Sequence, residues 1–219
     1  MRLASVLLAR YYGLVQIEDL NLNGTVYYPE VTAKLVERYG FMKYPTGADA
    51  FDETKGIEFN AGRAGKQVID KLMILSSGVY LDTPIDTTTS EALWFEMMEW
   101  AVNEFGVTFS PEMVTRCAYV SNVTFHSDAP ILAVNPIMSE IGKVVAAQVE
   151  SSFKLSLDYE PAAVSITFDQ LATKLGPAAF TVQRREGVPF GENKYFSTAP
   201  LKTEIHLDLL ERWERAVKV

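Results

Sequence analysis

The sequence predicts an α+β fold, with an antiparallel or mixed sheet and about three amphipathic helices packed on one face. Segments rich in β-branched and aromatic residues follow one another in pairs, whereas a doubly wound α/β fold alternates strands and helices. Three other segments repeat apolar residues at helical spacing and begin at residues that favour helix starts. At 219 residues, a single domain is large enough to be stable without a disulfide or a metal ion.

The N-terminal segment is expected to form regular structure instead of a secretion signal. The apolar run within residues 1–10 is short and ends at an arginine, where a cleavage site would need small residues. A first strand or a short helix is therefore expected there. Residues 14–22 are interpreted as extended. A short helix is expected over Glu30–Tyr39, because Pro29 suits its start and Gly40 its end.

A hairpin and a long helix are predicted to follow. Val68–Leu75 and Val79–Asp82 are separated by two serines and a glycine, which fits a hairpin with a three-residue loop. The helix is predicted to begin at Thr88, whose hydroxyl would form a capping box with Glu91, and to end at Gly106. Its tryptophan and methionine side chains cover more than one face. This helix is therefore expected to be central to the fold or buried in a subunit contact.

The second half of the chain is predicted to contain four strands and two helices. Residues 118–125 form its first strand. Asn135 and Pro136 then start a helix, as a cap followed by a first helical residue. Three more strands and a last helix are expected over residues 164–168, 180–185, 194–197 and 203–216.

Both helices of the second half repeat side chains on one face. In the first of them these are Ile137, Ile141, Val144, Val145 and Gln148. In the last helix they are Ile205, Leu209, Trp213 and Val217. The solvent-facing side of the last helix is expected to carry the acid-before-base pairs Asp208–Arg212, Glu211–Arg215 and Glu214–Lys218.

The order of predicted elements is similar in residues 14–106 and 117–217, where a strand and a helix precede two or more strands and a helix. A structural duplication would explain this order. We therefore expect one α+β domain over residues 1–219, which a duplication would divide into subdomains 1–109 and 110–219.

The composition disfavours several classes of function. The net charge of −8 repels nucleic-acid phosphate and no basic stripe offsets it, so a nucleic-acid partner is not expected. No stretch approaches the roughly 20 apolar residues of a membrane-spanning helix, so a membrane partner is not expected either. Two histidines and one cysteine, without an HExxH or CxxC motif, disfavour a zinc site. Neither a metal site nor a cofactor is indicated, although a Mg²⁺ site built from scattered aspartates stays open.

The single cysteine, Cys117, is expected to be a small buried side chain in an apolar strand and not a nucleophile. A lone thiol cannot form an intramolecular disulfide, which fits a reducing compartment. A soluble, cytoplasmic protein is therefore expected.

Two segments have the composition of anion-binding loops without the required pattern. Asn60–Lys66 contains two glycines, an arginine and a lysine, but its spacing differs from that of a P-loop. The residues after it predict a strand, whereas a P-loop opens a helix, so we interpret it as a loop between elements. Asp82–Ser90 is rich in hydroxyls and leads into a helix, where turn and capping roles explain it without a serine nucleophile.

His126 and Asp128 are the candidate catalytic residues, because they lie at the end of a strong strand, where scaffolds position reactive groups. A histidine can act as an acid or a base near neutral pH, and Asp128 could orient it or raise its pKa. A turn in which Ser127 and Asp128 cap the strand explains the same residues equally well.

The segment Arg184–Pro200 is the candidate binding surface, because it combines arginines, aromatic residues, glycines and prolines. The expected contact residues are Arg184, Arg185, Phe190, Tyr195 and Phe196. Either arginine could hold a small anionic ligand. The alternative is a long hairpin connection packed by its own aromatic side chains.

We therefore predict a non-enzymatic protein that works by binding or assembly, with a protein partner or a second copy of itself as a homo-oligomer. The alternative is a small-molecule enzyme, acid–base or hydrolytic, in which His126 and Asp128 act on an anionic substrate held by Arg184 or Arg185. The enzyme would place His126 in a concave polar pocket, whereas the binding protein would leave it buried or idle.

Overall fold

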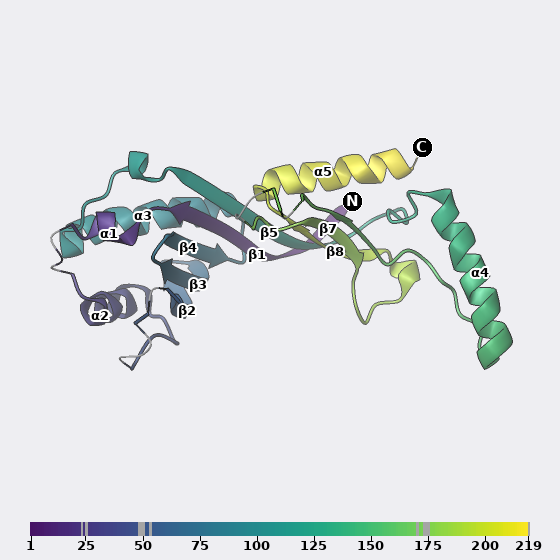
Figure 1. The fold of residues 1–219 in the computed structure, drawn as a ribbon, viewed down its shortest axis with the longest axis horizontal. Coiled ribbons are helices and arrows are strands. Elements are labelled where there is room, and N and C mark those ends of the chain that lie inside the picture. The colour runs from purple at the N-terminus through teal and green to yellow at the C-terminus, as the bar shows by residue number, and fades with distance from the viewer. Residues whose placement is uncertain are drawn as a thin grey trace. The chain divides into compact units, whose positions relative to one another are not determined.

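The computed structural model describes residues 1–22, 24, 26–47, 51–52, 54–169, 171–172 and 176–218. It confirms the α+β class, because the eight strands of the described residues form one antiparallel sheet that five α-helices accompany (Figure 1). The strands are β1 (Arg2–Leu14), β2 (Ile57–Ala64), β3 (Gln67–Leu75), β4 (Gly78–Thr83), β5 (Arg116–His126), β6 (Ala163–Ile166), β7 (Phe180–Arg184) and β8 (Lys194–Ala199). The helices are α1 (Ile17–Leu20), α2 (Tyr28–Tyr39), α3 (Thr87–Phe105), α4 (Pro136–Phe153) and α5 (Thr203–Val217).

The strand order in the sheet is β2-β3-β4-β1-β5-β8-β7-β6. In each half of the chain, the last strand (β4 or β8) lies beside the first (β1 or β5), and the other two follow outward to an edge. The order along the chain is also the same in both halves. A strand is followed by one or two helices, then by three strands, then by a helix.

By its internal contacts the chain divides into two compact units. The first unit comprises Val6–Ser121 and Pro200–Thr203, and the second comprises Met1–Ser5, Asn122–Ala199 and Glu204–Val219. Both β1 and β5 therefore contribute residues to each unit.

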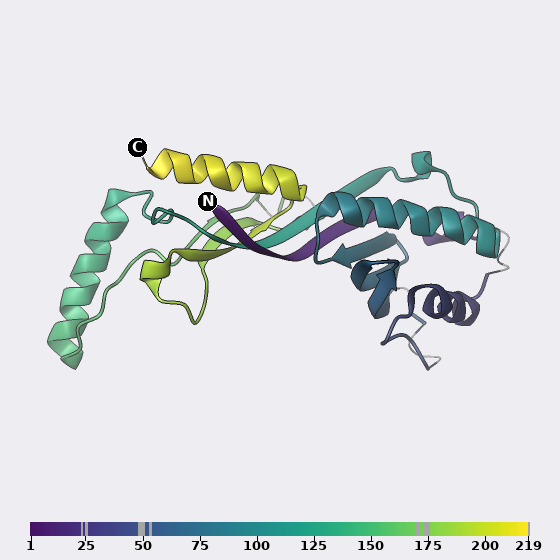
Figure 2. The ribbon, with the colours of Figure 1, turned by 180° about the vertical axis from the view of Figure 1, so that it is seen from behind.

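Trp94 of α3 lies in the core of the first unit. Its indole is fully buried, and Nε1 donates a hydrogen bond to the carbonyl of Val79 at 2.9 Å. The ring packs edge-on against Tyr11 of β1, with 5.4 Å between ring centroids. A Cβ at Gly13 would lie 2.5 Å from Cζ2 of Trp94, so the close approach of β1 to α3 requires a glycine here. Figure 2 shows α3 running along the strands of this unit.

The N-terminus of α3 is capped by a residue that the sequence did not single out. Asp86 is the N-cap, and its carboxylate accepts a hydrogen bond from the backbone N–H of Thr89 at 2.7 Å. The predicted capping box of Thr88 and Glu91 is therefore wrong. The carboxylate of Glu91 instead accepts a hydrogen bond from the Tyr119 hydroxyl at 2.9 Å. A carboxylate at the positive end of a helix is well suited to this capping role.

The structure tests two predictions about the secondary structure of the first unit, one near the N-terminus and one at the β3–β4 hairpin. The N-terminal segment is a strand, and it continues as far as Leu14. The expected extended stretch 14–22 is wrong, because α1 follows β1 directly. The β3–β4 hairpin is confirmed. Its loop has two residues instead of three, since Leu75 pairs with Gly78.

The segment Asn60–Lys66 and the single cysteine also differ from expectation. Most of Asn60–Lys66 belongs to β2, which pairs with β3 across a tight turn where Gly65 has a φ of 58°. The predicted inter-element loop is therefore a hairpin. Cys117 lies in β5 and is exposed, not buried. Its thiol lies 3.9 Å from the hydroxyl of Tyr119.

From Glu204 onward, α5 belongs to the second unit and turns a different face inward from the one predicted. Ile205 and Leu209 are exposed, whereas His206, Leu210 and Glu214 are buried. The periodicity of the apolar residues was misleading, because the two buried polar side chains have hydrogen-bond partners on other elements, Ser197 of β8 for His206 and Ser127 after β5 for Glu214. Of the three predicted ion pairs, Asp208–Arg212 forms at 2.6 Å and Glu214–Lys218 at 3.5 Å. The third, Glu211–Arg215, is not formed in the described part of the chain.

Candidate functional site

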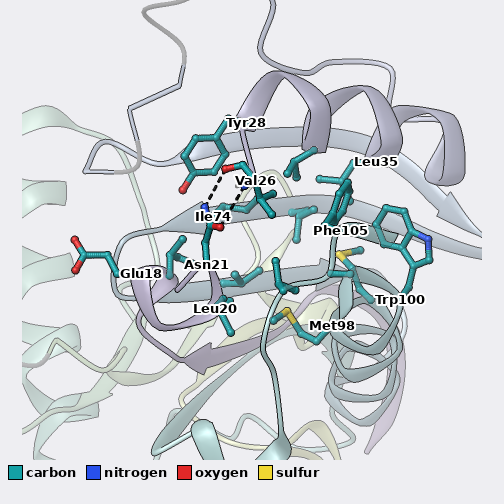
Figure 3. Close-up of a pocket in the computed structure, with 17 residues that line it drawn as sticks. Glu18, Leu20, Asn21, Val26, Tyr28, Leu35, Ile74, Met98, Trp100 and Phe105 are labelled. Atoms are coloured by element: carbon teal, nitrogen blue, oxygen red, sulfur yellow. Dashed lines mark hydrogen bonds between the residues drawn. The ribbon is translucent and has the colours of Figure 1, made fainter. Parts of the chain in front are cut away.

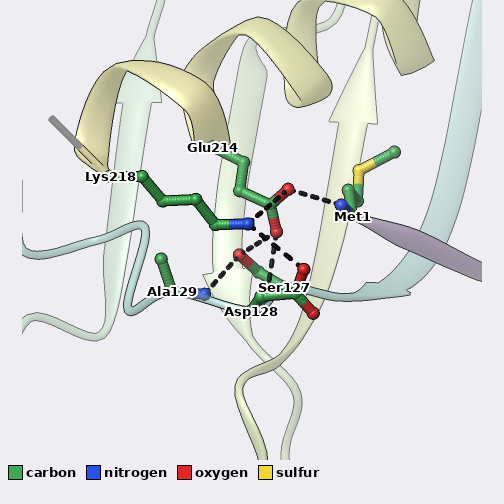
Figure 4. A network of polar contacts seen from close by, with 6 residues as sticks. All are labelled: Met1, Ser127, Asp128, Ala129, Glu214 and Lys218. Atoms are coloured by element: carbon green, nitrogen blue, oxygen red, sulfur yellow. Dashed lines mark hydrogen bonds and ion pairs between the residues drawn. The ribbon is translucent and has the colours of Figure 1, made fainter.

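The predicted catalytic residues lie where expected, at the end of β5, but the structure does not join them. His126 is the last residue of β5 and is half-buried. Asp128 is exposed, and its carboxylate pairs with the ammonium group of Lys218 at 3.1 Å (Figure 4). Within the described ranges, no hydrogen bond connects the side chains of His126 and Asp128. The arrangement therefore lacks an aspartate that orients the imidazole.

A buried carboxylate, which was expected on the solvent-facing side of α5, organises this region instead. Glu214 of α5 accepts hydrogen bonds from the Ser127 hydroxyl at 2.7 Å and from the backbone N–H of Asp128 at 2.8 Å. It also pairs with the amino group of Met1, and with Lys218 at 3.5 Å. Figure 4 shows these groups converging on one side chain.

This network stabilises the fold of the second unit. Burial by itself would raise the pKa of Glu214, but the donors from Met1, Ser127 and Asp128 outweigh it and lower the pKa to about 2. The carboxylate is therefore ionised and already holds several donors, which leaves it unsuited to proton transfer near neutral pH. It ties α5 to the start of β1 and to the turn after β5.

The guanidinium of Arg184, one of the two arginines predicted to bind an anion, contacts other groups of the same chain. Its guanidinium pairs with the carboxylate of Glu160 and donates to the carbonyls of Phe190 at 3.1 Å and Pro161 at 3.3 Å. The Phe190 ring covers it, with 4.1 Å between the guanidinium carbon and the ring centroid. Arg184 therefore fastens the β7–β8 connection and the segment before β6 to the end of β7.

The other predicted contact residues are divided between the interior and the surface. Tyr195 is fully buried and stacks on Phe125, with 5.6 Å between ring centroids. Phe196 is half-buried. Arg185 and Phe190 are exposed. The connection is thus packed partly by its own aromatic side chains, as the alternative interpretation expects, and it presents a small mixed surface.

The helix α4 contacts the segment that follows it through a glycine. Its start is as predicted, because the side chain of Asn135 accepts a hydrogen bond from the backbone N–H of Ile137 at 3.1 Å. Gly142 is the buried residue of this helix. A Cβ at Gly142 would collide with the carbonyl oxygen of Tyr159, so the helix and this backbone segment touch directly. In Figures 1 and 2, α4 stands apart from the strands of its unit and does not lie across them.

The predicted apolar face of α4 points to solvent. We call its large side chains the α4 stripe; they are Ile137, Met138, Ile141, Val144 and Val145. These side chains are between 36% and 63% exposed, although at helical spacing they share one side of α4. An amphipathic helix normally buries such a stripe, whereas this helix packs through Gly142 and leaves the stripe free within the described structure.

Further apolar side chains are exposed at the C-terminal end of α4 and just after it. Phe153, Leu155 and Leu157 are also exposed, and Phe153 retains 76% of its accessible area. Isolated exposed apolar residues are ordinary in proteins, but a contiguous apolar surface marks an interaction site. This surface is the strongest candidate for a functional site in the second unit. The periodicity at Ile137 and Ile141 located the helix face but could not show that it is exposed.

Comparison with other proteins supplies no family. A scan against protein-family models finds no match, and a search of curated proteins also finds none. In the part of the chain that the structure describes, no helix is long and apolar enough to cross a membrane. The same residues contain no group of three or more His, Cys, Asp and Glu side chains placed to hold a metal ion.

Proposed function

We propose that the protein works by binding another protein chain through the α4 stripe, and that a second copy of itself is the partner. The observation that carries this proposal is the exposure of Ile137, Ile141 and Val144 on one side of α4. Removing such side chains from water is the main driving force of association between proteins.

The composition of α4 supports self-association. Of the charged residues of the helix, Lys143 and Glu150 lie away from the α4 stripe and Glu140 lies at its edge, where its carboxylate can stay in water when two copies meet. With 18 residues and a rise of about 1.5 Å per residue, α4 is long enough for side-by-side helix packing. Two-fold dimers are also the commonest oligomers, and they use the same patch on both copies.

The attachment of α4 supports a preformed surface. The helix contacts the backbone of Tyr159 at Gly142, where long side chains do not intervene. A helix that is already folded and seated loses less conformational entropy when a partner binds. This favours a docking role over that of a segment that orders only on binding.

Sedimentation velocity over a wide concentration range tests the proposal. The unaltered protein should shift from one copy towards two as the concentration rises. The double substitution Ile141→Glu with Val144→Glu should stay at one copy, because two carboxylates would have to be buried in the interface. Ala147→Glu is the matched control. It adds a carboxylate to an exposed position of α4 on the side of Lys143 and Glu150, and should leave association unchanged.

Far-ultraviolet circular dichroism of the same variants shows whether α4 remains folded. A protein that sediments as a single copy at every concentration would refute self-association. Equal effects of the stripe substitutions and of Ala147→Glu would refute the α4 stripe as the contact.

The repeated order of elements supports a second, structural proposal, that the two halves of the chain arose by duplication. The similar strand orders β2-β3-β4-β1 and β6-β7-β8-β5 support it, since each half places its first and last strands side by side. The exposed, lone Cys117 is consistent with the expected cytoplasmic location, because such a thiol persists in a reducing compartment.

A further inference from the structure

The first unit contains a cavity of about 360 Å³, distinct from the α4 stripe. It lies among α1, α2, α3 and the strands β3 and β4, as the labelled side chains in Figure 3 show. The cavity is open to solvent on one side, because Glu18 at its lining is exposed and Ile17 is half-buried. A ligand can therefore enter it.

The lining of the cavity is almost wholly apolar. Leu72, Ile74 and Val79 line it from the strands, and Met97, Met98 and Trp100 line it from α3. An apolar cavity of about 150 Å³ already stays dry and binds small apolar molecules. The present cavity is more than twice as large, and it lies within the usual range of small-molecule sites, about 300–1,000 Å³. Methionine side chains also adapt readily to the shape of a ligand.

The few polar groups at the cavity limit the chemistry of the ligand. The side chain of Asn21 is occupied by the backbone of Val26, donating to its carbonyl at 2.9 Å and accepting from its N–H at 3.2 Å. Among the described residues of the lining, Glu18 is the one that carries a charge, and it is exposed. The same residues include neither a lysine, an arginine nor a histidine. A carboxylate or phosphate ligand would thus find no cation among them, and its charge would lie near the acidic Glu18.

We propose that this cavity binds a small amphiphile with an apolar body and a neutral or cationic polar end. The apolar body fills the space between Leu72, Met97 and Trp100, which removes it from water. The polar end lies towards Glu18, where a hydroxyl group can donate a hydrogen bond and an ammonium group can form an ion pair. Fatty acids and other anionic amphiphiles are selected against by charge.

Fluorescence of N-phenyl-1-naphthylamine, a neutral probe that brightens in apolar sites, tests the proposal. The full chain should bind the probe, and decan-1-ol and decylamine should displace it. Decanoate, which has a chain of the same length, should displace it at least about tenfold less well, because of its charge. No probe binding, or displacement by decanoate equal to that by decan-1-ol, would overturn the proposal.

Two substitutions on α3 locate the probe. Ala101 lines the cavity, and Ala101→Trp should fill it and weaken probe binding by at least about tenfold. Ala92 is an exposed residue of the same helix outside the lining, and Ala92→Trp should bind the probe as the unaltered protein does. Probe binding that survives Ala101→Trp would overturn the proposal.

Two further variants cover the remaining ambiguities. If Ala101→Trp does not fold, Glu18→Lys still tests the charge argument, because an exposed residue tolerates the change and the preference should reverse towards decanoate. An unchanged order of affinities in this variant would count against the proposal. The α4 substitutions Ile141→Glu and Val144→Glu should leave probe binding intact, and loss of binding there would assign the probe to the α4 stripe.

Discussion

Nε2 of His206 and the hydroxyl oxygen of Ser197 lie 2.8 Å apart in the interior of the second unit, and both residues are fully buried. The serine hydroxyl also donates to the carbonyl of Thr181 at 2.7 Å. Because that bond uses the single hydroxyl proton, Nε2 is the donor to Ser197. The pair therefore holds α5 on β8 and β7. In a serine nucleophile with its base, the hydroxyl donates its proton to the imidazole, whereas here the imidazole donates to the hydroxyl.

The acid sensitivity of the fold between pH 6.5 and about 4 is expected to come from His206. Burial lowers the pKa of its imidazole from 6.5 to about 4, so the folded protein resists a proton that the unfolded chain accepts. Stability should be complete above pH 6.5 and fall as the pH drops towards 4, by at most about 3 kcal/mol. Urea unfolding at a series of pH values measures this.

The substitution His206→Gln is the control for this pH dependence. The amide can still donate to Ser197 but does not titrate, so the free energy of unfolding should be nearly constant over the same interval. A slope that persists in this variant would assign the pH dependence to other groups.

A second loss of stability is expected at lower pH, from Glu214. Its pKa is lowered from 4.5 to about 2 in the folded protein, so the stabilisation is complete above pH 4.5 and disappears as the pH falls to about 2. At neutral pH, Glu214→Gln should lower the free energy of unfolding by about 2 kcal/mol, because charged hydrogen bonds to Ser127 and Asp128 become neutral ones. Chemical denaturation measures both effects.

The exposed partner in the same network supplies the comparison. Asp128→Asn removes an ion pair with Lys218 in which the carboxylate is 78% exposed. It should cost less than about 1 kcal/mol. A larger loss from Asp128→Asn than from Glu214→Gln would show that Glu214 is not the anchor.

The cap of α3 gives a third prediction. Asp86→Ala should lower the free energy of unfolding by about 1 kcal/mol, because the backbone N–H of Thr89 loses its acceptor. Thr88→Ala, at an exposed position in the first turn of the same helix, should have little effect. Thermal unfolding of both variants measures the difference, and the opposite order would restore the capping box that the sequence suggested.

Local patterns predicted much of the fold. The β3–β4 hairpin, the N-cap at Asn135 and the boundary of α3 at Gly106 depend on neighbouring residues, and the structure contains all three. The inward face of α5 could not be predicted in this way. It depends on Ser197 of β8, which satisfies His206, and on the turn after β5, which is distant in sequence and satisfies Glu214.

The candidate sites were less accessible from the sequence. Arg184 is a residue type that often contacts ligands, which is why the sequence suggested it. Its ion pair with Glu160 depends on the fold and could not be predicted from the sequence. The α4 stripe was identified as a helix face through Ile137 and Ile141, but periodicity does not distinguish a buried face from an exposed one. The cavity in the first unit is formed by residues from three helices and two strands, and no linear motif marks such a convergence.

A helix surface usually both holds the helix in place and binds its partners. The contact between Gly142 and the backbone of Tyr159 separates these two roles in α4. The helix is positioned by main-chain atoms and a missing side chain, so the residues on its outward side contribute little to holding it in place. Those residues are free to change during evolution without loosening the helix. Specificity for a partner can therefore diverge while Gly142 keeps this contact.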